Sequence, residues 1–145
     1  MHNDNPEFAA HFTHLADGRL CFPYCVACAR FHWYPMPLCP YCQSAGFEWR
    51  QVTGCGTLYS WTEIHHAFDV RYSGPLPYIV ALIDFVDAPG VRLVSNIVGA
   101  AADALTLDMT VAVHFSHDAQ GHPQVTFRPL VYSQIVAVHQ YAICA

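Results

Sequence analysis

The chain has 145 residues, which is enough for one modest domain and a small appended module. It is 54% hydrophobic and only 12% charged, and its six cations are all arginine, set against eleven acidic residues. That balance excludes a basic track for nucleic acid, and no apolar run reaches the ~18–20 residues of a membrane-spanning helix. With so few charges to solvate its exterior, we expect a partner protein to cover part of the surface.

Residues 1–18 are predicted to form a short N-terminal helix. Asn5 is a suitable N-cap, Pro6 fits the first helical position, and Gly18 supplies the stop. An apolar stripe follows at helical spacing, formed by Phe8, Phe12 and Leu15. This stripe either packs in the core of the chain or docks on another subunit, because little chain precedes the next module to cover it.

Residues 19–46 contain two Cys-x-x-Cys pairs separated by ten residues, a spacing that predicts a zinc ribbon. Each pair presents two sulfurs from one tight turn, and a tetrahedral cage for Zn2+ is completed by Cys25, Cys28, Cys39 and Cys42. The alternatives are four buried thiols or two disulfides. A redox pair would require a strand before it and a helix after it, and the region is broken by Pro23, Pro35, Pro37 and Pro40.

A cage of four protein sulfurs leaves no open position for water or substrate, so this zinc is expected to be structural. Seven cysteines, four of them used for metal, are typical of a reducing compartment. The opening residues, Met1 to Pro6, lack the basic and apolar regions of a signal peptide. We therefore predict a cytoplasmic protein.

Residues 47–129 change to short apolar segments separated by turns, which predicts a mainly β domain. The candidate strands are 47–52, 57–70, 78–86, 91–98, 110–116 and 124–128, with one helical turn capped by Asp103 within residues 100–107. Five main strands with a short helix after the third describe a small closed barrel, the OB-fold, with an SH3-like barrel as the nearest alternative. Residues 130–145 are assigned to a C-terminal extension that adds an edge strand or a partner-binding arm.

No residue is predicted to be catalytic, and the chain is not expected to be an enzyme by itself. His65 and His66 are neighbours in a strand-like stretch, so their side chains point to opposite faces and cannot share a metal. Cys55 lies between two glycines, but the sequence identifies no base or positive group that would lower its pKa. A glycine-rich phosphate loop is excluded too, because the chain has no lysine.

Beyond the cysteines, several motifs occur in a fixed order over about residues 7–129. They are Glu48-Trp49, Gly54-Cys55-Gly56-Thr57-Leu58-Tyr59-Ser60, Leu76-Pro77-Tyr78-Ile79-Val80-Ala81-Leu82, Gly90-Val91-Arg92-Leu93 and Phe127-Arg128-Pro129. With the second pair written Cys-Pro-x-Cys, this order resembles the DUF35 family, in which a rubredoxin-like zinc ribbon precedes an OB-fold barrel. Two positions depart from the family pattern: Ala29 replaces a glycine after the first knuckle, and Tyr34-Pro35-Met36 replaces Pro-Pro-Arg.

The resemblance implies a non-catalytic accessory subunit of a thiolase-like or aldolase-like enzyme that acts on acyl-CoA substrates. In such hetero-oligomers the catalytic Cys and His lie on the large partner. The small subunit stabilises that partner and helps to form the acyl-CoA channel. A coenzyme A thioester bound at the partner interface is part of this expectation, but no residue of this chain is assigned to it.

Two other functions are compatible with these modules. Zinc ribbons and OB barrels also bind single-stranded nucleic acid, and bases could stack on Phe31, Trp33, Trp49, Tyr59 and Trp61. Six scattered arginines among eleven acids argue against that reading. A lone acyl-CoA carrier would need cations for the phosphates, and the candidates Arg30, Arg50 and Arg71 are equally suited to ordinary ion pairs.

Overall fold

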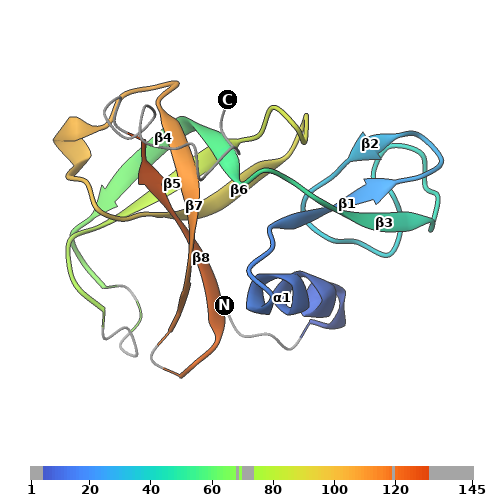
Figure 1. Cartoon of the computed structure of the whole chain (residues 1–145), viewed down its shortest axis with the longest axis horizontal. Coiled ribbons are helices and arrows are strands. Elements are labelled where there is room, and N and C mark those ends of the chain that lie inside the picture. Colours follow the sequence, from blue (N-terminus) through green and yellow to red (C-terminus); the bar gives the residue numbers. More distant parts are fainter. Residues whose placement is uncertain (1–4, 68, 70–73, 119, 131–145) are drawn as a thin grey trace.

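The computed structural model describes residues 5–67, 69, 74–118 and 120–130. A small three-stranded sheet and a closed five-stranded barrel lie side by side, with one helix next to their junction (Figure 1). The predicted fold class, mainly β with an N-terminal helix and a closed barrel, is confirmed. Apart from Leu130, the predicted C-terminal extension lies outside the described residues.

The N-terminal helix begins as the sequence predicts. A 3-10 turn, Pro6–Phe8, runs directly into α1, Ala9–Ala16, and the backbone N–H of Glu7 donates to Asn5 Oδ1 over 3.0 Å. Gly18 ends the helix with a φ of +69°, a conformation that costs glycine little. Among the described elements, no helix is both long and apolar enough to cross a bilayer.

The apolar stripe of α1 packs within the chain. The helix lies against β1, Cys21–Cys25, and β8, Pro123–Pro129. Leu15 is fully covered, and Phe12 packs against the edge of the core. His11 is buried as well, with its ring 4.9 Å from that of Trp33, and burial lowers the pKa of His11 to about 4. Of the two expectations for the stripe, the structure adopts the intramolecular one.

The small sheet has the strand order β2-β1-β3, with β2 spanning Arg30–Phe31 and β3 spanning Phe47–Gln51. All its pairs are antiparallel, and β3 pairs with the whole of β1, from Cys25 opposite Phe47 to Cys21 opposite Gln51. β3 lies in the segment 47–129 that the sequence division gives to the barrel. Here it completes the ribbon sheet instead.

The barrel closes in the order β4-β5-β6-β8-β7. Its further strands are β4 (Cys55–Ile64), β5 (Tyr78–Asp84), β6 (Arg92–Ile97) and β7 (Thr110–His117), with a 3-10 turn at Ala102–Ala104 between β6 and β7. All pairs are antiparallel except β6 with β8, which are parallel. A five-stranded closed barrel with a short helix after its third strand has the architecture predicted for an OB-fold.

Two details of the barrel differ from the sequence prediction. β4 ends at Ile64 instead of continuing to Val70, because its partner β5 begins opposite, at Tyr78, directly after Pro77. Val70 itself lies outside the described residues. Asp103 lies within the 3-10 turn and does not cap it, since the N-cap position is taken by Ala101.

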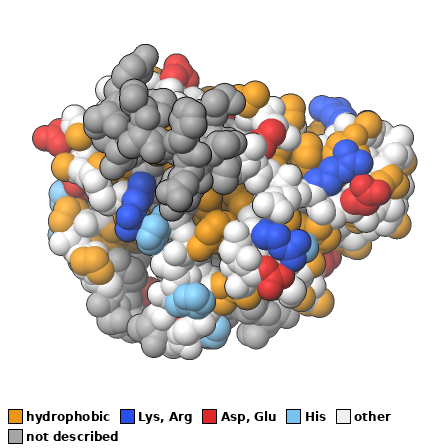
Figure 2. All heavy atoms as spheres, viewed as in Figure 1, with side chains coloured by type: hydrophobic (Ala, Val, Ile, Leu, Met, Phe, Trp, Pro, Cys, Tyr) orange, Lys and Arg blue, Asp and Glu red, His pale blue; other side chains and the backbone are white. Residues whose placement is uncertain are grey.

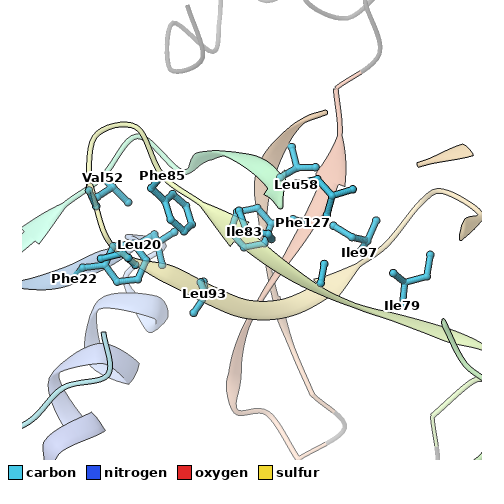
Figure 3. Close-up of a cluster of buried hydrophobic side chains, with 14 of the residues drawn as sticks. Leu20, Phe22, Val52, Leu58, Ile79, Ile83, Phe85, Leu93, Ile97 and Phe127 are labelled. Atoms are coloured by element: carbon cyan, nitrogen blue, oxygen red, sulfur yellow. The ribbon is translucent and has the colours of Figure 1, made fainter. Parts of the chain in front are cut away.

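One hydrophobic core runs through both sheets. Leu20, Phe22 and Val52 from the ribbon side meet Phe85 and Leu93 of the barrel (Figure 3). The Phe22 ring lies 5.1 Å from the ring of Phe85 and 5.2 Å from that of Trp33. The barrel interior continues from there through Leu58, Ile83 and Phe127, each completely covered. The ribbon and the barrel therefore share one hydrophobic core and are not two domains joined only by a linker.

Removing the Phe22 ring tests this shared packing. Phe22→Ala is expected to lower the free energy of unfolding by about 3–5 kcal/mol, because it leaves a cavity between Trp33 and Phe85. Urea unfolding of the zinc-loaded protein measures the change. Leu107→Ala, at a side chain that is 63% exposed, is the control and should cost less than about 0.5 kcal/mol. Equal costs for the two variants would contradict a shared core.

Candidate metal centre

Four sulfur atoms converge at the end of the ribbon. The Sγ atoms of Cys25, Cys28, Cys39 and Cys42 all lie within 4.8 Å of one another. Cys25 Sγ is 3.6 Å from Cys42 Sγ, and Cys28 Sγ is 3.7 Å from Cys39 Sγ. A regular tetrahedron with Zn–S distances of about 2.3 Å has S···S edges of about 3.8 Å. The spacing of these sulfurs fits a zinc ion at their centre.

Each Cys-x-x-Cys pair is a single tight turn of the chain. The N–H of Ala29 donates to the Cys25 carbonyl over 2.9 Å, and the N–H of Gln43 donates to the Cys39 carbonyl over 3.0 Å. The residue after each second cysteine therefore turns back sharply, with φ of +56° at Ala29 and +61° at Gln43. An L-residue with a Cβ strains in this region, which explains why relatives are expected to prefer glycine at the position of Ala29.

Backbone donors and burial set the protonation of the sulfurs. The N–H of Cys28 lowers the pKa of the Cys25 thiol to about 7, whereas burial and the neighbouring sulfurs raise the pKa of Cys28 to about 12. The N–H of Tyr41 also points to Cys39 Sγ at 3.4 Å. Four crowded thiols cannot all ionise beside one another, but a divalent cation stabilises all four thiolates together. The donor set thus fits Zn2+ as a structural staple.

The histidines do not join this centre. In the described part of the chain, the four cysteines are the only group of three or more His, Cys, Asp or Glu side chains close enough to hold an ion. His65 lies past the end of β4 and pairs with Glu63 over 3.0 Å. His122 Nδ1 contacts Asp118 at 3.0 Å in the turn between β7 and β8, which is ordinary turn stabilisation.

The other candidates of the sequence are spread over the molecule. Arg30 stacks on Tyr41 at 3.7 Å, while Arg50 stacks on Tyr24 at 3.4 Å and pairs with Glu48. Arg71 lies outside the described residues. Asp84 pairs with Arg92 over 2.9 Å, and the carboxylate of Asp87 accepts from the Thr53 N–H, so these two acids serve separate contacts. Cys55 is half-buried at the start of β4.

The rings proposed for base stacking are mostly covered. Of the five, Tyr59 is the most exposed, at 45%, and the Arg92 guanidinium lies 3.8 Å from its ring centroid. Phe31, Trp33 and Trp61 pack against the core. The described surface therefore offers little for a track of successive bases.

A hollow of about 360 Å3 lies where the ribbon meets the barrel. Its walls include Trp33 from the ribbon side, with Phe85, Val91 and Arg92 from the barrel side. The indole Nε1 of Trp33 is buried and has no hydrogen-bond partner among the described residues. Sequence reasoning named Trp33 only as a stacking ring and did not single out Arg92, because the hollow exists only once the two sheets pack together.

The paired sheets, the four converging sulfurs and the barrel order define a zinc-ribbon OB-fold protein. Residues 12–48 match the model of the ChsH2 rubredoxin-like zinc ribbon domain, and residues 49–116 match that of the ChsH2 C-terminal OB-fold domain. A solved structure described as the Ltp2–ChsH2(DUF35) aldolase contains a chain that is 30% identical to this one, with a TM-score of 0.80. The match covers 90% of this chain and all of that one. The chain belongs to the DUF35 family, and its zinc site is structural.

Two further relatives were found. A DUF35-family protein of unknown function from Sulfolobus solfataricus shares the fold at 17% identity, with a TM-score of 0.61 and 87% of each chain covered. A Thermomonospora curvata protein named "Probable enoyl-CoA hydratase alpha subunit" is 32% identical over 130 residues, which is 88% of this chain. The chain spans only 39% of the length of that curated relative.

Loss of one sulfur should release the metal and the ribbon together. Cys39→Ser is expected to abolish zinc binding and to unfold residues 21–46, because metal binding supplies the folding free energy of such a segment. Metal analysis and backbone amide exchange measure the two effects. Cys21→Ala is the control, since this buried cysteine lies outside the group of four and its variant should keep its zinc. Full zinc occupancy in Cys39→Ser would contradict the assignment.

The left-handed turn at Ala29 makes a second prediction about the same knuckle. Ala29→Gly should raise the free energy of unfolding by about 1 kcal/mol, because glycine adopts a φ of +56° without the Cβ strain. Urea unfolding of the zinc-loaded protein is the measurement. Ala27→Gly, two residues earlier and at an ordinary φ, should instead lower stability. A loss in both variants would mean that the Ala29 turn is unstrained.

Proposed function

We propose that this chain is a non-catalytic accessory subunit of a thiolase-like or aldolase-like enzyme that acts on acyl-CoA substrates. The observation that carries the proposal is the full-length match to the ChsH2(DUF35) chain of an aldolase that also contains Ltp2. The relative named as an enoyl-CoA hydratase alpha subunit supports it, because a subunit name also implies a partner. The chain itself is proposed to work in a hetero-oligomer.

The metal is proposed to serve this role by holding the ribbon in shape. Cys25, Cys28, Cys39 and Cys42 are the proposed ligands, and four protein sulfurs leave Zn2+ no position for a substrate. The ion pairs Glu63–His65, Asp84–Arg92 and Asp118–His122 lie at separate places on the molecule, and His11 and His32 are buried. This arrangement favours chemistry on the partner rather than on this chain.

The hollow between the ribbon and the barrel is the proposed contribution to the acyl-CoA channel. It is walled by Trp33, Phe85 and Val91, with the ion pair of Arg92 and Asp84 at its side. Its apolar walls suit an acyl or pantetheine segment. The barrel would then flank the channel entrance while the ribbon contacts the large subunit.

Co-expression tests the proposed function. The tagged chain, produced with the thiolase-like protein of its own organism, is expected to co-purify with it in a fixed ratio and to raise its activity on an acyl-CoA substrate. The Cys39→Ser variant is the control and should lose both effects if the folded ribbon is required. A chain that stays monomeric and leaves the activity of the thiolase-like protein unchanged would refute the proposal.

A further inference from the structure

Exposed apolar side chains concentrate on one part of the ribbon. Of the ten large apolar side chains exposed in the described part of the chain, five lie between residues 26 and 41. They are Val26, Tyr34, Met36, Leu38 and Tyr41. We call residues 26–46 the ribbon tip. Figure 2 shows apolar surface next to arginine side chains at the ribbon end of the molecule.

The ribbon tip needs no burial of these side chains to stay folded. Its turns are held at the four sulfurs, and although Phe31 and Trp33 pack against the core, Val26 and Leu38 stay about half exposed. A patch of this kind on a small protein marks an interaction site rather than a deficient core. Because the sulfurs converge within 4.8 Å, the patch is also held in one conformation before any partner arrives.

A single cation lies in the ribbon tip. Arg30 is the only charged residue between positions 26 and 46. Its guanidinium lies 3.7 Å from the ring centroid of Tyr41 and forms no ion pair with any described residue. By contrast Arg19, Arg50 and Arg92 are each paired with a carboxylate, at 2.7, 3.0 and 2.9 Å. Arg30 is thus oriented by a ring while its donors stay available.

We propose that the ribbon tip is the surface that docks the thiolase-like partner, and that Arg30, stacked on Tyr41, pairs there with a carboxylate of that partner. This inference rests on the proposed function. Arginine and tyrosine surrounded by apolar side chains are the typical composition of an interface hot spot. The partner face is then apolar, with one acidic group opposite Arg30.

Charge argues against the other occupants of this surface. Two copies of the chain that met tip to tip about a two-fold axis would bring two apolar patches together, each with Arg30 as its only charge and no acid to oppose it. Nucleic-acid binding is disfavoured because the ribbon tip has one cation, whereas several phosphates would need to be neutralised. A partner carboxylate meets the single guanidinium with a bidentate pair, which is the strongest match that arginine makes.

The test measures the affinity of purified variants for the purified thiolase-like protein of the same organism by calorimetry. Arg30→Glu and Leu38→Asp are each expected to weaken binding about 30-fold or more, which corresponds to a hot-spot loss of about 2 kcal/mol. Val94→Asp on β6 is the matched control, because Val94 is 49% exposed and Leu38 46%. Its affinity should change less than about fivefold. Met36→Asp replaces Leu38→Asp if the latter loses zinc.

The outcomes separate the two proposals. Failure of the wild-type chain to bind the thiolase-like protein overturns the proposed function itself. Wild-type binding that survives Arg30→Glu and Leu38→Asp but is lost in Val94→Asp leaves the function intact and overturns the ribbon tip as the interface. Free coenzyme A is titrated in parallel. If Arg30→Glu abolishes coenzyme A binding while partner affinity is unchanged, Arg30 holds a phosphate and the carboxylate pair is refuted.

Discussion

The packing of the Phe22 ring between Trp33 and Phe85 joins the ribbon to the barrel. Phe22 belongs to β1 of the ribbon sheet, yet its ring is completely covered by barrel and ribbon side chains together. Phe85 in turn lies 6.0 Å from Phe127, in the middle of the barrel. These contacting aromatic rings, from Trp33 to Phe127, therefore fix the angle between the two sheets. The hollow at their junction and the direction in which the ribbon tip projects both depend on that angle.

Two different kinds of interaction stabilise the two parts of the molecule. The barrel and the inner half of the ribbon are held by burial of apolar side chains, whereas the outer half of the ribbon is held by sulfur atoms. The second kind leaves side chains such as Met36 and Leu38 partly exposed, at 38% and 46%. An apolar surface can then be displayed at little cost to folding. This separation of structural metal from exposed surface suits a protein whose role is to hold a partner.

Local signals in the sequence predicted much of this structure. The cysteine spacing located the metal site, Asn5 and Pro6 located the start of the helix, and short apolar segments between turns located β5 and β7. These features depend on residues close together in the chain. The pairing of β3 with β1, the burial of His11 and the hollow beside Trp33 depend on contacts between distant segments. The hydrophobic periodicity of a segment carries no information about such long-range contacts. For this reason the sequence prediction assigns β3 to the barrel and Trp33 to the surface.

The parallel pairing of β6 with β8 has a consequence for how the chain is made. Only two residue pairs join these strands, Asn96 with Thr126 and Ile97 with Phe127, yet they complete the barrel wall. The last described strand to leave the ribosome is therefore the one that seals the interior. The knuckles, in contrast, are complete before any barrel strand has been synthesised. During translation the zinc-loaded ribbon would fold while the barrel is still incomplete and its apolar interior is exposed. A chaperone or a partner protein would bind this exposed interior most readily in that interval.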